Sequence, residues 1–241
     1  MHYMPLRGVL FDMDDTLFDH NYSTDQALAA LRVEESTFTV WPAHELRERH
    51  SAMLETLHAE VLSFRLSIAE AREERFRRLF TDAADAPPPP GRALQLADVY
   101  RLSYRASWRP VAGAIDLLKD LRAANLTIAI VTNNLVAEQT EKLRACRMDP
   151  LVDALITSEE IGVQKPDPHI FRETLTRLGL QPAEAVMVGD AWRADVVGAL
   201  AADIRPVWFN WRGTPTPDAN VEEIAALEPL SRASAVIRGR S

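Results

Sequence analysis

Residues 8–17 read GVLFDMDDTL, a short apolar run that ends abruptly in a cluster of acidic residues. This pattern is typical of a buried central strand whose carboxyl end meets solvent. Similar apolar runs recur at residues 126–131, 185–188 and 206–209, with a weaker one at 154–156. Helix-like segments alternate with these runs. The alternation predicts an α/β fold with a Rossmann-like parallel sheet core covered by helices on both faces.

Three helices are expected among these strands, because apolar residues recur there at spacings of three or four. Their positions are Ile115, Leu118 and Leu121; Leu135, Gln139 and Leu143; and Ile170, Phe171, Leu175 and Leu178. Asp167 and Pro168 supply a natural N-cap and first-turn proline for the third helix.

The stretch from about residue 18 to residue 107 breaks the alternation, because it holds hardly any strand-like run. We expect an all-helical insertion at 18–107 and a core built from 1–17 and 108–241. The tetraproline at residues 87–90 would be stiff and extended, and therefore a connector between two helices. The apolar helical positions are Leu46, His50, Met53, Leu54, Leu57, Val61 and Phe64, then Phe76, Leu79 and Phe80, then residues 94–102.

The composition limits the class of partner. The 241 residues are 47% hydrophobic and 26% charged, so the chain can bury a substantial core and does not resemble a disordered protein. With 27 basic against 35 acidic side chains, the net charge of −8 would repel a polyanion, and we expect no nucleic-acid partner. Cys146 is the only cysteine, which excludes an intramolecular disulfide and a cysteine-based metal cluster.

No targeting segment is recognisable in the sequence. The N-terminus has too short an apolar core for a signal peptide, and no apolar stretch approaches the roughly 20 residues of a membrane span. A single cysteine suits a reducing compartment. We therefore expect a cytoplasmic protein without a membrane partner.

Polar residues gather where the predicted strands end. In open parallel sheets, ligands bind outside the carboxyl ends of the strands, so these residues should line one pocket. Three acids in one place would repel each other unless a hard cation lay among them, and oxygen ligands suit magnesium. The residues are Asp12 and Asp14 after the first strand, Thr132 and Asn133 after the second, Lys165 after the third, and Asp190 and Asp195 after the fourth.

Such a pocket suits phosphoryl transfer. A carboxylate can attack phosphorus, which splits one difficult displacement into two easier ones. A second acid two residues away can protonate the departing oxygen and later take a proton from water. Lys165 and Thr132 can hold the equatorial oxygens of the transferring group.

The order of these residues resembles the haloacid dehalogenase superfamily. Residues 12–17 look like its first motif, DxDxT, and Val131-Thr132-Asn133 like its second. Lys165-Pro166 matches the third motif, and residues 189–195 match the fourth, GDxxxxD. The insertion at 18–107 then corresponds to a helical cap between the first motif and the second strand, a region that this family uses for substrate choice.

The resemblance assigns a role to each residue. It implies that Asp12 is the nucleophile and a magnesium ligand, and that Asp14 is the general acid and base and offers its main-chain carbonyl to the metal. Asp190 is the other protein ligand of the metal, and Asp195 acts from behind these ligands. Thr132 and Asn133 bind phosphate, while Lys165 orients Asp12, balances charge and contacts phosphate. The implied activity is magnesium-dependent hydrolysis of a small phosphate monoester through an aspartyl-phosphate.

Three other functions use a similar set of residues. Haloacid dehalogenases displace halide with the same aspartate, but they need neither an acid for the leaving halide nor magnesium, so Asp14 favours phosphoryl chemistry. A phosphosugar mutase of the same superfamily keeps the whole phosphatase set and differs mainly in its cap. A signalling receiver also places acids, a threonine and a lysine at strand ends, but its phospho-accepting acid follows a later strand.

The substrate is left open between nucleotides, sugar phosphates and organic acid phosphates. Residues 11–18, FDMDDTLF, look like the same region of pyrimidine nucleotidases, which slightly favours nucleotides. A helical cap can exclude bulky macromolecules, which favours a small phosphorylated metabolite. The protein could be a monomer or a homodimer. Six further aromatic or polar residues flank the expected site. His20, Asn21 and Trp108 are expected as substrate contacts or hinge residues, and Trp192, Trp208 and Trp211 as core packing.

Overall fold

The computed structural model describes residues 5–63 and 65–239. Its chain divides into two compact units, one formed by residues up to Asp19 together with those from Arg109 onward, the other by His20–Trp108. We propose that these units are the core domain expected at 1–17 and 108–241 and the helical cap domain expected at 18–107.

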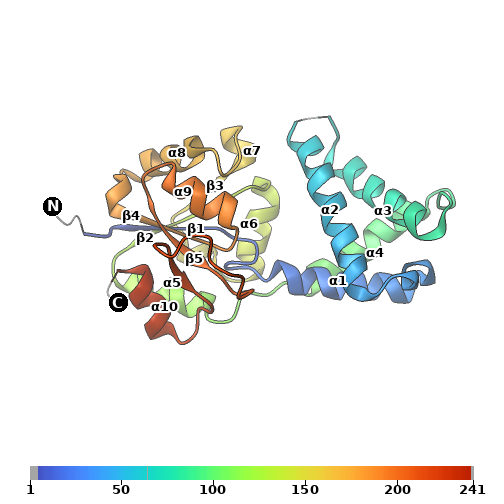
Figure 1. Ribbon diagram of the computed structural model, residues 1–241. Coiled ribbons are helices and arrows are strands. Elements are labelled where there is room, and N and C mark those ends of the chain that lie inside the picture. The colour runs from blue at the N-terminus through green and yellow to red at the C-terminus, as the bar shows by residue number, and fades with distance from the viewer. Residues whose placement is uncertain (1–4, 64, 240–241) are drawn as a thin grey trace. The chain divides into compact units, whose positions relative to one another are not determined.

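The first unit is built on a six-stranded parallel sheet with the order β3-β2-β1-β4-β5-β6 (Figure 1). Five strands fall where the sequence predicts them, which confirms the α/β fold. The strands are β1 (Gly8–Phe11), β2 (Thr127–Thr132), β3 (Ala154–Thr157), β4 (Ala185–Gly189), β5 (Arg205–Phe209) and β6 (Glu222–Ile224).

Strand order decides where a ligand can reach the sheet. β1 is central, because it pairs in parallel with β2 on one side and with β4 on the other. The chain adds β2 and β3 on one side of β1 and then adds β4, β5 and β6 on the other side. The order of the strands therefore reverses between β1 and β4, and open α/β sheets bind ligands in the crevice at such a point. Asp12 follows β1 and Asp190 follows β4, so the two acids meet at this crevice.

Helices cover both faces of this sheet. α8 and α9 pack together over one face, while α5 and α10 pack together over the other (Figure 1). The first face has a fully buried core in which Leu10 of β1 and Met187 of β4 pack with Phe171 of α8. The helices are α5 (Ala114–Ala123), α6 (Val136–Ala145), α7 (Ser158–Ile161), α8 (Pro168–Leu178), α9 (Gly198–Leu200) and α10 (Leu230–Ile237).

The three helices predicted in the core are confirmed as α5, α6 and α8. α8 begins as expected, because the side chain of Asp167 accepts a hydrogen bond from the His169 amide, 2.9 Å away. Pro168 takes the first helical position, where a missing amide hydrogen removes no intrahelical bond. α8 ends at Gly179, whose φ of 63° is left-handed and suits glycine.

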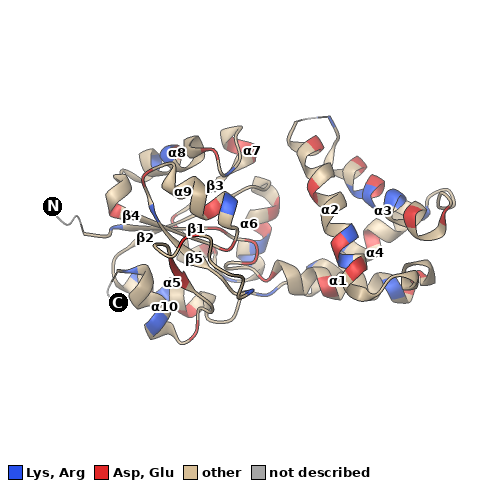
Figure 2. Cartoon of the chain, viewed as in Figure 1, with Lys and Arg blue, Asp and Glu red and all other residues tan. Residues whose placement is uncertain are grey.

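The second unit consists of helices throughout, which confirms the all-helical insertion. The tetraproline lies between α3 and α4, as predicted for a connector. Acidic and basic residues both occur along α2 and α3 (Figure 2), and Glu74 accepts from both Arg77 and Arg78 at 2.6 Å. The elements are α1 (His20–Glu34), the 3₁₀ turn η1 (Ser36–Val40), α2 (Ala43–Leu62), α3 (Ile68–Ala84) and α4 (Arg92–Ala106).

The core of this second unit follows the predicted stripes in part. Leu46, Leu57, Phe76 and Leu79 are buried, and so is His50, whose ring lies 4.7 Å from that of Tyr100. Burial lowers the pKa of His50 well below its usual value, so it packs as a neutral ring. In the stretch 94–102, Leu94 and Leu102 are exposed, and the helix buries Leu96 and Tyr100 instead. Phe64 lies outside the described residues.

Within the described part of the chain, no helix combines the length and apolarity that crossing a bilayer requires.

Candidate active site

Asp12 begins the loop that leaves β1, and it is buried. Its amide donates to the carbonyl of Val188 in β4 at 2.9 Å, which ties the residue to the crevice between the two strands. The Thr16 hydroxyl donates to Asp12 Oδ2 at 3.3 Å. Between them the chain turns sharply, with Asp15 in the left-handed region at φ 61°. This turn returns Thr16 to the strand end and explains why acid and hydroxyl stand four residues apart.

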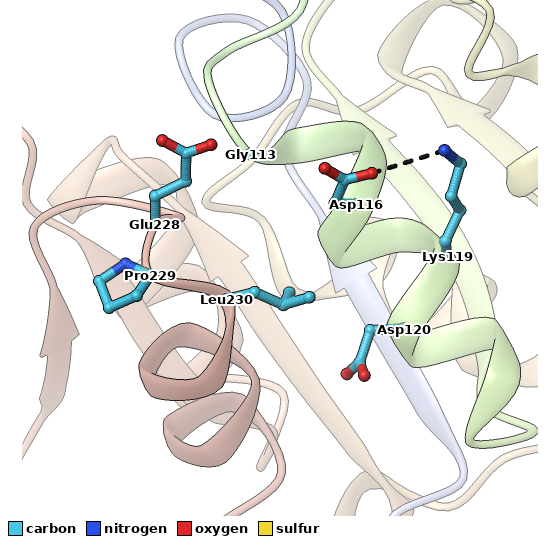
Figure 3. A pocket seen from close by; sticks show the side chains of 7 residues that line it. All are labelled: Gly113, Asp116, Lys119, Asp120, Glu228, Pro229 and Leu230. Atoms are coloured by element: carbon cyan, nitrogen blue, oxygen red, sulfur yellow. Dashed lines mark hydrogen bonds and ion pairs between the residues drawn. The ribbon is translucent and has the colours of Figure 1, made fainter.

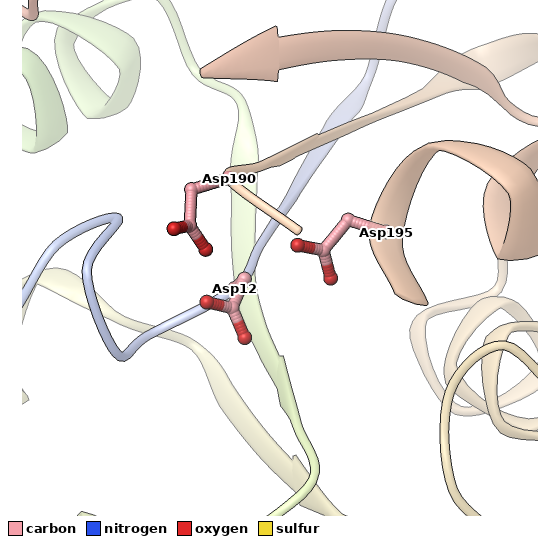
Figure 4. A group of neighbouring side chains, drawn as sticks. All are labelled: Asp12, Asp190 and Asp195. Carbon is pink, nitrogen blue, oxygen red and sulfur yellow. The ribbon is translucent and has the colours of Figure 1, made fainter. Parts of the chain in front are cut away.

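Two further acids lie beside Asp12 at the end of β4. Oxygen atoms of Asp12, Asp190 and Asp195 all lie within 4.8 Å of one another. Figure 4 shows the three carboxylates gathered in one place. Asp195 lies in a π-helical turn, Trp192–Val197, and its Oδ2 accepts from the Ala191 amide at 2.9 Å. A Cβ on Gly189 would approach the Asp195 carboxyl to 2.3 Å, so this strand end requires glycine.

Lys165, from the loop after β3, offsets part of the negative charge of this cluster. Its Nζ donates to Asp12 Oδ1 and to Asp195 Oδ1, both at 2.6 Å, and the ammonium is buried. Asn133 holds the Lys165 main chain on both sides, because its Nδ2 donates to the Lys165 carbonyl at 2.8 Å and its Oδ1 accepts from the Lys165 amide at 2.6 Å. The loop is therefore fastened to the end of β2.

Burial dominates the electrostatics of this group. Loss of solvation raises the pKa of Asp12 well above its ordinary value, even though the Lys165 ammonium opposes the shift. Asp195 and Asp190 add to the rise in the pKa of Asp12. Loss of solvation likewise raises the pKa of Asp195. Burial would lower the pKa of Lys165, but the charges of Asp12 and Asp195 outweigh it and raise that pKa.

Asp14 stands two residues after Asp12 in the chain, and its side chain is held from α6. Lys142 Nζ donates to Asp14 Oδ1 at 2.6 Å, and Gln139 Nε2 donates to Asp14 Oδ2 at 2.8 Å. Asn134 Nδ2 adds a longer bond of 3.2 Å to Oδ2. Gln139 Nε2 also donates to the hydroxyl of Thr132, 3.1 Å away, which is buried at the end of β2.

The chain matches the model of the haloacid dehalogenase-like hydrolases over residues 6–203, which span β1 to β4 and the helical insertion. The chain belongs to the haloacid dehalogenase-like hydrolases. This confirms the resemblance that the strand-end residues indicate, and it identifies the protein as an enzyme of the hydrolase class.

Haloacid dehalogenase-like proteins of several kinds are similar to this chain. The ribulose-1,5-bisphosphate 5-phosphatase of Halopiger xanaduensis is 30% identical over 90% of this chain and 89% of its own. The pyrimidine 5′-nucleotidase PynA of Streptococcus pneumoniae is 27% identical over 84% of this chain and 83% of its own. The putative HAD-hydrolase YfnB of Bacillus subtilis, solved with bound magnesium, has a TM-score of 0.75 at 23% identity, covering 96% of this chain and 99% of that one.

The residues of this haloacid dehalogenase-like site fit a hard divalent cation. The donors within 4.8 Å of one another are carboxylate oxygens, which Mg²⁺ prefers. Asp195 uses one oxygen for Lys165 and the other for the Ala191 amide, so it braces the group from behind. Both oxygens of Asp12 also accept hydrogen bonds, from Lys165 and from Thr16, so the choice of Asp12 and Asp190 as metal ligands rests on the family motifs and stays a proposal.

Arg212 and Trp211, on the loop after β5, both contact Asp190. Nothing in the sequence indicated Arg212, and core packing was predicted for Trp211. Arg212 donates to Asp190 Oδ2 at 2.6 Å, and Trp211 Nε1 donates to the same oxygen at 3.2 Å. The expected core packing is wrong for Trp211, because it is 39% exposed. Trp208 is buried as expected, and it donates to the Asp190 carbonyl at 2.9 Å. Trp192 is half-buried and meets the Trp208 ring edge-to-face.

Residues outside the haloacid dehalogenase-like motifs have other partners. His20 and Trp108 both lie in the second unit, where His20 Nδ1 is 2.7 Å from the Tyr104 hydroxyl. A role for His20, Asn21 or Trp108 toward substrate stays a proposal. Cys146 is buried, and burial raises the pKa of its thiol to about 11, which keeps the thiol protonated and unreactive at neutral pH.

A separate pocket of about 610 Å³ lies between α5 and the start of α10 (Figure 3). It is lined by Gly113, Asp116, Lys119, Asp120, Glu228, Pro229 and Leu230. Asp116 and Lys119 pair with each other at 3.4 Å. None of the lining residues belongs to the acidic cluster, so this pocket does not extend the site.

Proposed function

We propose that this haloacid dehalogenase-like hydrolase removes phosphate from small phosphate monoesters, with Asp12 as the nucleophile. The observation that carries the proposal is the pair of acids after β1. Asp12 faces a buried ammonium, while Asp14, two residues on, is directed to a different set of donors. Lys165 thus supports Asp12 as an anion beside the crevice, and other partners hold Asp14, to which we assign the proton transfer.

The chain's residues divide two chemical steps between them. An oxygen of Asp12 attacks phosphorus, the bond to the ester oxygen breaks, and Asp14 gives that oxygen a proton. Water then attacks phosphorus, Asp14 takes its proton, and the bond between Asp12 and phosphorus breaks. Lys165 holds Asp12 in place through a 2.6 Å bond. Thr132, and Asn133 beside it at the strand end, would contact the phosphate oxygens.

We propose that the site works with Mg²⁺, which would neutralise charge on the phosphate oxygens. The side chains of Asp12 and Asp190 and the main-chain carbonyl of Asp14 would hold the ion, with Asp195 bracing the group from behind. The supporting observation is the clustering of the three carboxylates within 4.8 Å. Magnesium in the YfnB structure is consistent with this choice.

Asp14 favours phosphoryl chemistry over dehalogenation. Halide is a stable anion that departs without a proton, whereas an ester oxygen gains from one. Three side chains hold Asp14 at distances of 2.6 to 3.2 Å, an arrangement with no evident use in dehalogenation. A phosphosugar mutase would use the same residues and is the second candidate.

We propose small phosphorylated metabolites as the substrate class, with nucleoside monophosphates and sugar phosphates tested first. Two relatives that match most of this chain are named for such substrates, a pyrimidine 5′-nucleotidase and a ribulose-1,5-bisphosphate phosphatase. Organic acid phosphates complete the panel of test substrates.

The test measures release of inorganic phosphate from this panel and from 4-nitrophenyl phosphate. Activity should require Mg²⁺, disappear with a chelator and return when Mg²⁺ is restored. Asp12→Asn should lower kcat by on the order of 10⁴- to 10⁶-fold, because the nucleophile is lost. Asp116→Asn makes the same charge change at an exposed position of α5 and should keep wild-type activity.

Three results would contradict the proposal. Undiminished turnover in Asp12→Asn would show that Asp12 is not the nucleophile. Isomerisation of a sugar phosphate without phosphate release would identify a mutase. Absence of phosphate release from every substrate by the wild-type protein would reject the function.

A further inference from the structure

The buried face of α6 carries polar residues where an amphipathic helix usually carries apolar ones. Gln139 and Lys142 are 0% and 1% exposed, and they share the inner face with Leu143. A spacing of three residues places Gln139 and Lys142 on the same side of the helix. Burying an amide and an ammonium costs free energy unless each finds partners, so their contacts indicate why they are there.

Lys142 is directed at Asp14. Its ammonium donates to Asp14 Oδ1 at 2.6 Å and also lies 3.4 Å from Glu138 Oε1. It sits 4.8 Å from the centre of the Phe18 ring, whose face attracts a cation. The ammonium is therefore fixed on several sides, and it fixes one oxygen of Asp14 in turn.

Gln139 joins Asp14 to Thr132. Its Nε2 donates one hydrogen to Asp14 Oδ2 at 2.8 Å and the other to Thr132 Oγ1 at 3.1 Å. The opposite amide orientation would turn the Gln139 carbonyl oxygen toward a carboxylate, which repels it. The orientation is therefore determined by its partners. One amide nitrogen then spans the proposed proton-transfer group and a proposed phosphate-binding group.

This bridge decides the direction of the Thr132 hydroxyl. A hydroxyl has one hydrogen to donate, and an amide NH₂ can only donate. Thr132 Oγ1 must therefore accept from Gln139, which leaves its own hydrogen for another acceptor. A phosphate oxygen at the end of β2 would be such an acceptor. The same amide thus orients a donor toward phosphate and a carboxylate beside it.

We propose, on the basis of the phosphatase function proposed above, that Gln139 and Lys142 are positioning residues that hold Asp14 and Thr132 in one fixed arrangement. They act through Asp14 and Thr132 and do not themselves react. Together, Gln139 and Lys142 fix the position of the Asp14 carboxyl, the proposed proton donor, when the ester oxygen departs.

A purely structural role explains Gln139 poorly. Its Oε1 is buried and has no hydrogen-bond partner among the described residues. An unsatisfied buried acceptor destabilises a fold, and an apolar side chain of similar shape would avoid that loss. Some natural sites keep a destabilising group because activity depends on it. Methionine, unbranched and of similar length, is the replacement that separates stability from activity.

The test compares two substrates that differ in how much they need an acid. Phenolate is a more basic leaving group than 4-nitrophenolate, so phenyl phosphate gains more from protonation than 4-nitrophenyl phosphate. The parameter is kcat/KM, which covers the steps up to departure of the leaving group. In Gln139→Met and Lys142→Met, the ratio of kcat/KM for phenyl over 4-nitrophenyl phosphate should fall by about tenfold or more.

Thermal unfolding of the same variants supplies the control for folding. Gln139→Met should unfold close to the wild-type temperature, because removal of the unsatisfied oxygen offsets part of the loss of the two hydrogen bonds from Nε2. Lys119→Met makes the same substitution as Lys142→Met at an exposed lysine of α5 and should keep the wild-type ratio. Lys142→Met tests the arrangement through a different contact, so the test does not depend on one variant.

The outcomes separate this proposal from the function on which it rests. A lowered ratio in folded Gln139→Met or Lys142→Met supports positioning of Asp14. An unchanged ratio in both folded variants, or loss of activity that only parallels loss of folding, overturns it while wild-type phosphatase activity stands. If the wild-type protein releases phosphate from no ester of the whole panel, the proposed function fails, and the positioning role fails with it.

Discussion

Lys165 is the residue that makes the buried acids compatible with one another. It bonds Asp12 and Asp195 at 2.6 Å each, and all three side chains are at most 11% exposed. At such buried positions, an unpaired carboxylate lowers the free energy of unfolding far more than it would at the surface. The ammonium therefore serves stability and chemistry at the same time, since the anion it protects is the proposed nucleophile.

Replacement of Lys165 by Met should destabilise the protein by about 3–5 kcal/mol at neutral pH, because buried carboxylates lose their partner. Asp12 and Asp195 already have raised pKa values, so their contribution to stability is present below the ordinary pKa of 3.8 and is lost as pH rises through the folded-state pKa. Without the ammonium this loss grows, and the deficit of the variant should be large near pH 7 and small below pH 3.8.

Urea unfolding at several pH values measures this deficit. Lys119→Met, whose ammonium is exposed, should change the free energy of unfolding by less than about 1 kcal/mol. A Lys165→Met deficit that did not vary with pH would show that lost packing, and not the carboxylates, causes the destabilisation.

Site residues were predictable where they directly follow a strand. Asp12, Thr132 and Asp190 stand at strand ends, where a short apolar run turns polar. Gln139 and Lys142 were not, because they act from the middle of a helix, where Gln139 fits an apolar stripe and Lys142 looks like a solvated charge. Gln139, a polar residue in the otherwise apolar stripe of α6, was the one feature of the sequence that could have indicated this role.

Arg212 shows a different reason for failure. It reaches Asp190 from a loop after β5, through a pairing between residues 22 positions apart. Nothing in the local sequence distinguishes such an arginine from a surface one. Only the strand order, which places β5 beside β4, brings the two together.

At the scale of an element, the end of β4 depends on one glycine. Gly189 is the last residue of the strand, and the turn that follows places Asp195 directly over it. The carboxyl of Asp195 is held on both oxygens, by Lys165 and by the Ala191 amide. The Asp195 carboxyl therefore cannot move aside for a larger residue at position 189 without losing one of these bonds.

Gly189→Ala should destabilise the protein by about 1–3 kcal/mol and lower kcat strongly, because the new methyl group displaces Asp195 from Lys165. Gly179→Ala is the matched control. It places a methyl group at φ 63°, with no atom within 4 Å, and should cost about 1–2 kcal/mol through backbone strain alone. Its folded fraction should retain wild-type kcat. Equal kcat in both folded variants would contradict the proposed role of Gly189.

Elements with a strong pattern were predicted, and one weak element was missed. β1, β2 and β4 are continuous apolar runs, because a central parallel strand is buried on both faces. β6 reads Glu-Glu-Ile and pairs with one neighbour only. Charged residues are common on edge strands, where they hinder unwanted pairing, and they also hide the strand from a search for apolar runs.

At the scale of the whole molecule, the chain leaves the sheet after β1 and returns before β2. The first unit contains every residue of the acidic cluster, and the second is helical throughout. The candidate site is therefore predictable from the geometry of a parallel sheet, which brings its strand ends together, whereas backbone geometry gives no indication of the substrate. Family membership narrows the reaction class and leaves the metabolite to experiment.

The most direct test of the central claim is detection of phosphate on Asp12 itself. The protein is mixed with 4-nitrophenyl phosphate and Mg²⁺, quenched within one turnover and treated with borohydride, which reduces an acyl phosphate to an alcohol. Mass spectrometry of the peptide that carries Asp12 should then show homoserine at position 12, at a level that falls when substrate is omitted. Homoserine at another acid, or unmodified Asp12 during demonstrable turnover, would contradict the account.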